Sequence, residues 1–244
     1  MNRIRAAAIH FSISAVVAIG LLALFWFVWY PAPLFRAVGG LEIFLMLLVI
    51  DVVLGPLLTF VVFKPGKKTL KFDLAVIAVV QVAALAYGVY TLLAGRPVYV
   101  ASLGDGFKLV QANEVETRDL EIAKTTLPRW GPKWVGTKKS TDPKENERVL
   151  LTGAAGGGYA HFPQHHVPIE SMRAVMLARA NPISVLRRNN PERDTEITAW
   201  LSSRSYTDQT AVFQPFRAAR ERMAVILDAK TAAVIGIAPF KPWD

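Results

Sequence analysis

The 244-residue sequence contains no cysteine. A chain without thiols has no disulfide framework and no thiol chemistry. It also lacks a His-Glu-x-x-His motif, a Gly-x-Ser-x-Gly elbow around Ser203, and a Lys-Ser/Thr pair after the glycine-rich stretch 153–158. We therefore expect no catalytic residues, no metal and no cofactor, and we interpret residues 153–158 as a linker.

Acidic residues are scarce in the first part of the chain, where residues 1–96 contain 3 Asp/Glu and 8 Lys/Arg. Three nearly uncharged apolar runs cover most of this part. A helix needs about 20 apolar residues to cross a hydrocarbon core of ~30 Å. We predict transmembrane helices at about 7–30, 42–63 and 74–95. The first run ends in Trp26-Phe-Val-Trp-Tyr30 rather than in small residues, which favours a retained anchor over a cleaved signal peptide.

Lysine and arginine in the short flanks predict the orientation. Six cations flank one side of the predicted spans, and the opposite loop offers only Arg36. We expect the N-terminus and the lysine hairpin 64–71 to be cytoplasmic, against anionic lipid, and residues 96–244 to form a periplasmic domain of a multi-pass protein in a bacterial inner membrane. The six topogenic residues are Arg3, Arg5, Lys64, Lys67, Lys68 and Lys71.

The formal net charge of +9 does not indicate nucleic-acid binding. Residues 97–244 contain 20 Lys/Arg and 16 Asp/Glu, without a basic stripe. The positive excess of the N-terminal part is the topogenic set. We therefore expect no nucleic-acid partner.

Small and polar residues interrupt the second and third predicted spans. Asp51, Gly55 and Thr59 follow a spacing of four and share a helix face. Pro56 lacks an N–H, so we expect the carbonyl of Val52 to lose its partner and the helix to bend there. A helix face of small and polar residues allows a neighbouring helix to pack closely. The third span carries a similar stripe, formed by Ala78, Gln81, Ala84 and Gly88.

A carboxylate at membrane depth needs a partner or a function. Counting 1.5 Å per residue from Phe63 places Asp51 about 18 Å from the cytoplasmic boundary. The same count from the start of the third run places Gln81 at about 10 Å and Tyr87 at about 20 Å. One hypothesis is that Asp51 is protonated, or hydrogen-bonds Tyr87, and holds the three-helix bundle together; another is that it faces a partner's transmembrane helix. A proton or ion relay is a third, although three spans with one acid make a poor pathway.

Residues 96–244 predict an α+β domain. Turn residues Gly104-Asp-Gly106 separate strands at 98–103 and 107–111, and a second strand pair is expected at 223–227 and 233–237. Helices are expected from Asp142 to Gly153, from Val167 to Asn181, and after Asn190. We interpret three histidines as a surface cluster: His161, His165 and His166. Four aromatic residues are expected in the core: Trp130, Trp134, Phe162 and Trp200. Three arginines are expected to be solvated: Arg217, Arg220 and Arg222. In the helix expected from Val167 to Asn181, one face is formed by Ile169, Met172, Val175 and Met176.

Ten short segments, taken in order, resemble the TfpX/TfpZ family of type IV pilin accessory proteins. They cover nearly the whole chain and are densest in residues 30–99. The segments are YPAPLF at 30–35, GG at 39–40, DVVLGPLLT at 51–59, VFKPGKK at 62–68, LKFDL at 70–74, Gln81, Tyr87-Gly88, RPVY at 96–99, LDAKT at 227–231 and IAPFKPW at 237–243. One departure is Thr231-Ala-Ala233, where the family tends to have Thr-Gly and an acid; Ala is less comfortable than Gly at a positive φ.

The resemblance implies an inner-membrane accessory protein or chaperone that binds the type IV (major) pilin and modulates its assembly and surface display, with inner-membrane pilus assembly proteins as further partners. It implies no catalysis. Alternatives are a membrane-anchored hydrolase or protease that uses Asp51 with a histidine, and a structural component of an envelope assembly complex. Type IV pilins carry an acid in their own apolar helix, which we expect near Gln81, Ser12 and Thr59. The candidate residues for docking a partner helix are Asp51, Gly55, Pro56, Thr59, Gln81, Tyr87 and Gly88.

Overall fold

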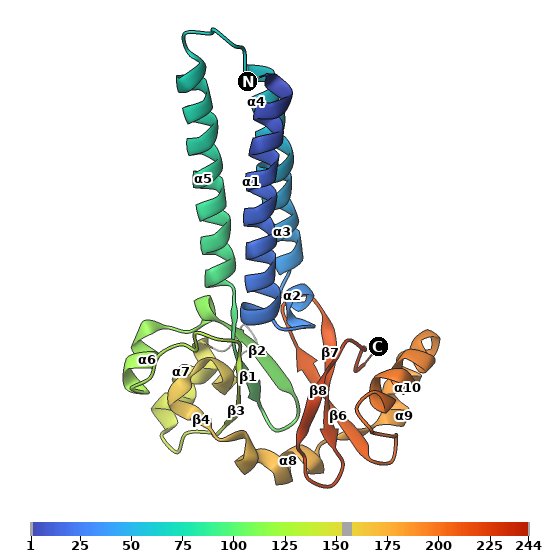
Figure 1. Cartoon of the computed structure of the whole chain (residues 1–244). Coiled ribbons are helices and arrows are strands. Elements are labelled where there is room, and N and C mark those ends of the chain that lie inside the picture. The colour runs from blue at the N-terminus through green and yellow to red at the C-terminus, as the bar shows by residue number, and fades with distance from the viewer. Residues whose placement is uncertain (1, 153–157, 244) are drawn as a thin grey trace. The chain divides into compact units, whose positions relative to one another are not determined.

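A computed structural model describes residues 2–152 and 158–243, which form two compact units (Figure 1). Unit 1 holds the residues up to Phe35 and Gly39–Gly95, and unit 2 holds the connector Arg36–Val38 and the chain from Arg96 onward. Most of the predicted linker at 153–158, with the predicted helix end at Gly153, lies outside the described residues.

Unit 1 consists of three long helices. They span Arg3–Trp29, Gly40–Val62 and Leu70–Ala94, and each is long and apolar enough to cross a membrane. The first comprises α1 (Arg3–Leu24) and a π-helical end, Phe25–Trp29, and the third is α5 (Leu70–Ala94). The second comprises α3 (Gly40–Leu48), a π-helical segment Val49–Leu54 and α4 (Gly55–Val62). A short helix, α2 (Leu34–Ala37), lies between the first and second helices in the chain.

An aromatic cluster closes one end of unit 1. Phe25 packs edge-on against Phe44 with ring centroids 6.2 Å apart, and Tyr30 packs against Phe35 at 5.4 Å. The Tyr30 hydroxyl donates to the Leu92 carbonyl, which ties the first span to the third. Along the outer faces, large apolar side chains such as Val16 and Val79 are exposed. An apolar outer surface of this extent suits hydrocarbon rather than water.

Unit 2 is built on a curled, mixed sheet of eight strands (Figure 1). The order is β4-β3-β1-β2-β6-β7-β8, with β5 paired to β6. Neighbours are antiparallel except for the β1–β3 and β2–β6 pairs, which are parallel. The strands are β1 (Pro97–Ser102), β2 (Phe107–Gln111), β3 (Lys133–Thr137), β4 (His166–Val167), β5 (Asn181–Pro182), β6 (Ala211–Arg217), β7 (Arg222–Asp228) and β8 (Val234–Ala238).

Short helices accompany the sheet of unit 2. They are α6 (Thr117–Ile122), α7 (Pro143–Thr152), α8 (Arg173–Ala178), α9 (Ile183–Arg188) and α10 (Asp194–Ser202), with 3₁₀ turns at Ala112–Glu114, Gly158–His161, Pro163–His165, Ile169–Met172 and Pro191–Arg193. A hydrophobic core forms where α9 and α10 bury Leu186 and Leu201 against Phe213 of β6 and Ile226 of β7.

The C-terminal tail is held by a buried amide. Asn190 donates to the carbonyls of Leu186 at 2.7 Å and Lys241 at 2.8 Å, and its side-chain oxygen accepts from the Lys241 N–H at 3.0 Å. A second buried amide, Gln214, donates to the carbonyls of Gly104 and Met176, each at 2.8 Å. These side chains satisfy backbone groups that the sheet leaves open.

Both predicted strand pairs are confirmed as antiparallel hairpins, β1–β2 and β7–β8. Two predictions about buried faces are wrong. Trp130 is 74% exposed rather than part of a core, because it lies in the bend before β3. Val175 is 42% exposed rather than buried on the expected helix face. The segment begins as a 3₁₀ turn at Ile169–Met172, and the tighter winding of this turn rotates Val175 out of line with Ile169 and Met172.

The turn before β8 adopts the conformation for which Ala is unfavourable. Ala232 has φ +56°, in the left-handed region. The Asp228 carboxylate holds the turn by accepting from the Lys230 N–H at 2.9 Å and the Thr231 N–H at 2.7 Å. The side chain of Asp228 therefore supports a turn in which the resembling family tends to use Gly.

Candidate functional site

The centre of the second span departs from α-helical bonding. In the π-helical segment Val49–Leu54, the Gly55 N–H donates to the Ile50 carbonyl, five residues back. The Asp51 carbonyl therefore loses the donor it would have in an α-helix. Its π-helical donor would be residue 56, which is a proline and has no N–H. The Asp51 carbonyl is thus left without a backbone donor, whereas the sequence analysis named only the Val52 carbonyl.

Gln81 of α5 satisfies this carbonyl. Its Nε2 atom donates to the Asp51 backbone oxygen at 3.3 Å. The amide passes directly over Gly55, where an added Cβ would lie 1.9 Å from Gln81 Nε2. A side chain at residue 55 would therefore displace the Gln81 amide from this position. Pro56, Gly55 and Gln81 thus form one linked arrangement across two spans.

His10 of α1 adds a polar contact that the sequence analysis missed. Its Nδ1 atom lies 2.6 Å from Thr59 Oγ1, and Thr59 is 4% exposed. His10 lies inside the first predicted span, where the sequence analysis did not consider it. An ionisable side chain within a predicted span is itself a signal of a functional site, and it was available in the sequence.

The three spans line an open-sided cavity of about 210 Å³ beside Asp51. Its lining is mainly apolar, with four polar side chains. Buried among them, Asp51 Oδ2 and Gln81 Oε1 have no hydrogen-bond partner among the described residues. Both atoms are acceptors when Asp51 is ionised, so the cavity is matched to an apolar group that brings a donor. The lining residues are His10, Ile13, Ser14, Val17, Ala18 and Leu21 of α1; Phe44, Leu47, Leu48 and Asp51 of the second span; and Ala78, Gln81, Val82 and Leu85 of α5.

The predicted bond between Asp51 and Tyr87 is wrong, since Tyr87 is 72% exposed on the outer face of α5. The depth count failed because it began at Leu74, whereas α5 begins at Leu70. From Leu70, Gln81 is about 16 Å into the helix, and Asp51 is the same distance from Val62. Ser12, expected near the polar pocket, is exposed and donates to the Ala8 carbonyl; Ser14 lines the cavity instead.

Four of the candidate docking residues pack within the chain's own bundle. Gly55, Pro56, Thr59 and Gly88 are all buried. A Cβ on Gly88 would lie 2.2 Å from Leu47 Cδ2, so this glycine permits the second and third spans to approach closely. The surface that these four residues would offer to another helix is therefore covered, while the cavity beside Asp51 is not filled.

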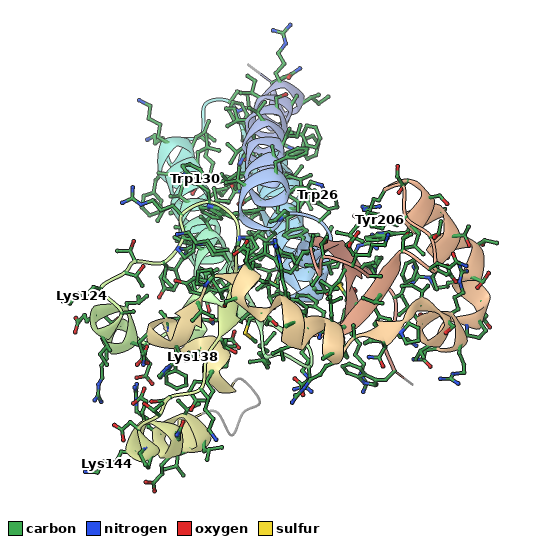
Figure 2. The ribbon with its side chains drawn as sticks, turned by 90° about the horizontal axis from the view of Figure 1, so that it is seen from below. Trp26, Lys124, Trp130, Lys138, Lys144 and Tyr206 are labelled. Carbon is green, nitrogen blue, oxygen red and sulfur yellow. The ribbon has the colours of Figure 1, made fainter. Side chains whose placement is uncertain are left out.

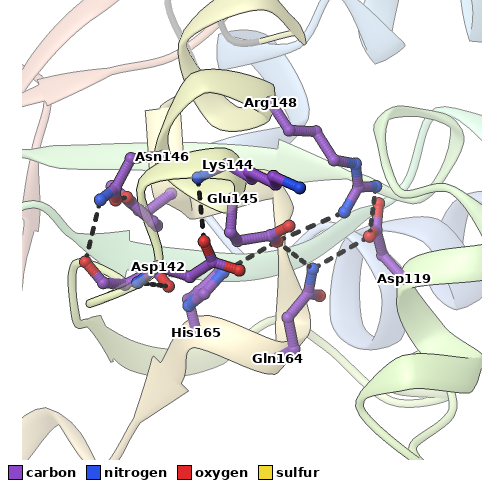
Figure 3. A network of polar contacts seen from close by, with 10 residues as sticks. Asp119, Asp142, Lys144, Glu145, Asn146, Arg148, Gln164 and His165 are labelled. Atoms are coloured by element: carbon purple, nitrogen blue, oxygen red, sulfur yellow. Dashed lines mark hydrogen bonds and ion pairs between the residues drawn. The ribbon is translucent and has the colours of Figure 1, made fainter.

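Unit 2 carries its own polar cluster, on α6, α7 and the turn before β4 (Figure 3). The buried Asp119 carboxylate accepts from Arg148 Nη2 at 2.6 Å and from Gln164 Nε2 at 3.0 Å. Glu145 lies 3.1 Å from His165 Nε2 and 3.3 Å from Arg148. The bond with His165, followed by Gln164 and Arg148, holds the pKa of the Glu145 carboxyl below its ordinary value.

The histidines of unit 2 make structural contacts rather than a shared site. His166 Nε2 donates to the Ala160 carbonyl at 2.9 Å, and burial lowers the pKa of this imidazole. His161 lies 3.9 Å from Glu114, and burial lowers its pKa as well. Among the residues that the structure describes, no group of three or more acidic or histidine side chains is arranged to hold a metal.

Comparison with known proteins places the chain in a family. A family model described as fimbrial assembly protein FimB matches residues 1–40. The fimbrial assembly protein of serogroup E1 from Dichelobacter nodosus is 27% identical over 229 residues, which is 91% of this chain and 89% of that protein. The protein of serogroups C1 and C2 from the same organism is 34% identical over 119 residues, which is 48% of this chain and 91% of that protein. The chain belongs to the fimbrial assembly protein family.

A third family member, of serogroup I from the same organism, is 28% identical over 230 residues, covering 91% of this chain and 89% of that protein. No solved structure matches the chain. These findings agree with the resemblance to pilin accessory proteins at the level of type IV fimbrial assembly, and the narrower TfpX/TfpZ assignment stays a prediction.

The topogenic residues gather at one end of unit 1 in this family member. The start of α1, with Arg3 and Arg5, lies at the same end as the hairpin between α4 and α5 (Figure 1). The four hairpin lysines are exposed, and Lys67 pairs with Asp73 at 2.6 Å. Exposed lysines are also spread over the outer loops and helices of unit 2, among them Lys124, Lys138 and Lys144 (Figure 2).

Proposed function

We propose that this protein is a membrane-embedded accessory protein of type IV fimbrial assembly that binds the apolar helix of a fimbrial subunit in the cavity beside Asp51. The single observation that carries the proposal is a cavity between three membrane-length helices, where two buried acceptor atoms have no partner in the described part of the chain. The family names support fimbrial assembly as the process. Binding of the subunit, and action as its chaperone, are our inference.

The chemistry of the cavity fits such an occupant. Apolar side chains from α1 and α5 form its walls, and they match the side chains of an apolar helix. The resemblance to pilin accessory proteins implies a subunit helix with an acid of its own. A carboxyl group in a low-dielectric site is neutral and donates a hydrogen bond. Such a donor would satisfy Asp51 Oδ2 or Gln81 Oε1.

We further propose the orientation that the flanking charges indicate. The Arg3 and lysine-hairpin end is cytoplasmic, and unit 2 lies in the periplasm, where it can contact the exposed part of the subunit. This placement puts the cavity near the middle of a bacterial inner membrane.

The test is to fill the cavity from α5. Ala78 lines it, whereas Ala75, one turn earlier and also exposed, does not. In a deletion strain, we expect the Ala78→Phe variant to lose co-purification of the fimbrial subunit and to display few surface fimbriae. The Ala75→Phe variant should behave as wild type. Equal subunit binding by both variants, at equal membrane levels, would refute the cavity as the binding site.

A second candidate function is hydrolysis, because His10, Ser14 and Asp51 line the same cavity. His10 is directed to Thr59, and no bond from Ser14 to His10 is present among the described residues. A Ser14→Ala variant that leaves fimbriation intact would exclude a serine nucleophile. A purely structural role in an envelope complex differs in stoichiometry, which co-purification measures directly.

A further inference from the structure

The turn between β6 and β7 carries three arginines, at residues 217, 220 and 222, and we call residues 217–222 the arginine hairpin. All three arginines are exposed, and Glu221 is the only acid in the hairpin. Three cations and one anion leave a local charge of +2. No part of the proposed subunit-binding cavity uses these residues, so the hairpin calls for a separate explanation.

The arginine hairpin is tied to the connector between the first two membrane helices. The Arg220 N–H donates to the Ala37 carbonyl at 3.0 Å, and both residues belong to unit 2. Ala37 precedes Gly40, the first residue of the second span, by three residues. Three residues of extended chain reach about 10 Å at most. Chain continuity therefore keeps the hairpin close to the point where the chain enters the membrane. Arg36, exposed on the same connector, adds a further cation.

A second contact within unit 2 involves a residue that closely follows the third span in the sequence. Arg96 follows Ala94, the last residue of the third span, by two residues, and its Nη2 atom donates to the Pro128 carbonyl at 3.4 Å. Two residues further along, Trp130 is 74% exposed. Tryptophan is enriched where a protein meets the lipid headgroups, because its ring is apolar and its N–H is polar. The prediction that Trp130 belongs to a core failed, and an interfacial position accounts for its exposure.

We propose that the arginine hairpin and Trp130 form a surface that binds the anionic phospholipid headgroups of the adjacent leaflet. The headgroup layer is about 5–7 Å thick on each side of the hydrocarbon core, which is within reach of an arginine side chain anchored this close to the span. The guanidinium group matches phosphate oxygens in a bidentate fashion. Lipid binding by this surface is independent of the fimbrial subunit and of the cavity beside Asp51.

The absence of cysteine permits a clean labelling experiment on the full chain. A spin label is placed at Ala219→Cys, which is exposed between the arginines, in protein reconstituted into nanodiscs. One set contains phosphatidylcholine alone, and the other contains about one third phosphatidylglycerol. The matched control is Lys230→Cys, exposed beyond the other end of β7. Six residue steps along β7 place the two ends of this strand about 20 Å apart.

We expect the label at 219 to become less accessible to a water-soluble relaxation agent in the anionic nanodiscs, and the label at 230 to be unchanged. Each arginine near an anionic surface should shift the docking equilibrium about fivefold, so replacing all three by Gln should shift it by about two orders of magnitude. High salt should also reduce the difference in accessibility of the label at 219 between the two sets of nanodiscs.

Three results would overturn the proposal. One is equal accessibility at 219 with and without anionic lipid. Another is an equal response at 230, which would indicate a change in the whole unit. The third is protection at 219 that depends on added fimbrial subunit rather than on lipid; this would assign the hairpin to an acidic protein surface.

Discussion

Replacing Pro56 by Ala should make the Gln81 side chain dispensable for stability. In the native chain the Asp51 carbonyl has no backbone donor, because the Gly55 N–H goes to Ile50 and Pro56 has none to offer. Gln81 supplies the donor instead. An alanine at 56 restores a backbone N–H at this turn. In either helical register the Asp51 carbonyl then has a backbone partner, so the Gln81 bond becomes redundant.

The size of the effect follows from the environment of the carbonyl. A buried carbonyl left without a partner costs about 1–3 kcal/mol. Side-chain hydrogen bonds between membrane helices average about 0.6 kcal/mol, with a maximum of about 1.7. We therefore expect Gln81→Leu to destabilise the wild type by about 1–2 kcal/mol and the Pro56→Ala variant by less than about 0.5 kcal/mol. The coupling between the two sites is then about 1 kcal/mol.

The assay is reversible unfolding of the full chain in mixed micelles, followed by helical circular dichroism for the wild type, both single variants and the double variant. A Gly55→Ala variant provides an independent check, because its Cβ would displace Gln81 Nε2. Its cost should largely vanish in a Gln81→Ala background, because this substitution also removes Gln81 Cδ, which would lie 2.6 Å from the added Cβ. If Gln81→Leu costs the same with Pro or Ala at 56, the carbonyl is not what Gln81 stabilises, and the interpretation of the π-helical segment is refuted.

Three further predictions concern packing, pH and the tail. Gly88→Ala should destabilise unit 1 by about 1–2 kcal/mol through the clash with Leu47, whereas Gly20→Ala, with nothing within 4 Å, should be neutral or stabilising; equal thermal melts would contradict this. Because burial lowers the pKa of His166 below 6.5, protons bind the unfolded chain preferentially in acid. Stability should fall below about pH 6.5 and fall less in His166→Phe, and parallel pH profiles of the melting temperature would exclude this contribution. Asn190→Ala should cost about 2–3 kcal/mol in chemical unfolding and release the C-terminal tail to proteolysis, and a tail that stays protected would show that other contacts hold it.

The membrane helices could be predicted from the sequence because hydropathy and length alone define them. The side-chain contacts between these helices could not be predicted. The error over Asp51 shows the reason. The third helix was counted from the first uncharged residue, but α5 begins at Leu70 and includes two charged residues in its first turn. One of them, Asp73, is accommodated by Lys67 at 2.6 Å and Thr69 at 3.1 Å. Charges that satisfy one another extend a helix beyond its apolar run.

The polar cavity was predictable in part. Asp51, Gly55, Pro56 and Gln81 stand out in the sequence because polar or helix-breaking residues are rare in spans. The contact between Gln81 and the Asp51 carbonyl depends on the π-helical bond from the Gly55 N–H to Ile50. The spacing of residues in the sequence does not reveal this bond.

In unit 2 the hairpins were predictable because their pairing is local and their turns have characteristic residues. The pairing of β2 with β6 joins Phe107 to Phe216 across more than a hundred residues. No local pattern encodes such a contact, and neither β3 nor β6 was predicted. The polar cluster around Asp119 likewise depends on α6 and α7 meeting in space.

The most direct measurement of the central proposal is photo-crosslinking from two valines of α5 in cells that express the fimbrial subunit. Val82 lines the cavity and is 65% exposed, and Val79 lies outside it and is 68% exposed. A photoreactive residue at 82 should trap the subunit, and one at 79 should trap mainly lipid. Equal yields from both positions, or no subunit from 82 in a strain with normal fimbriae, would contradict binding in this cavity.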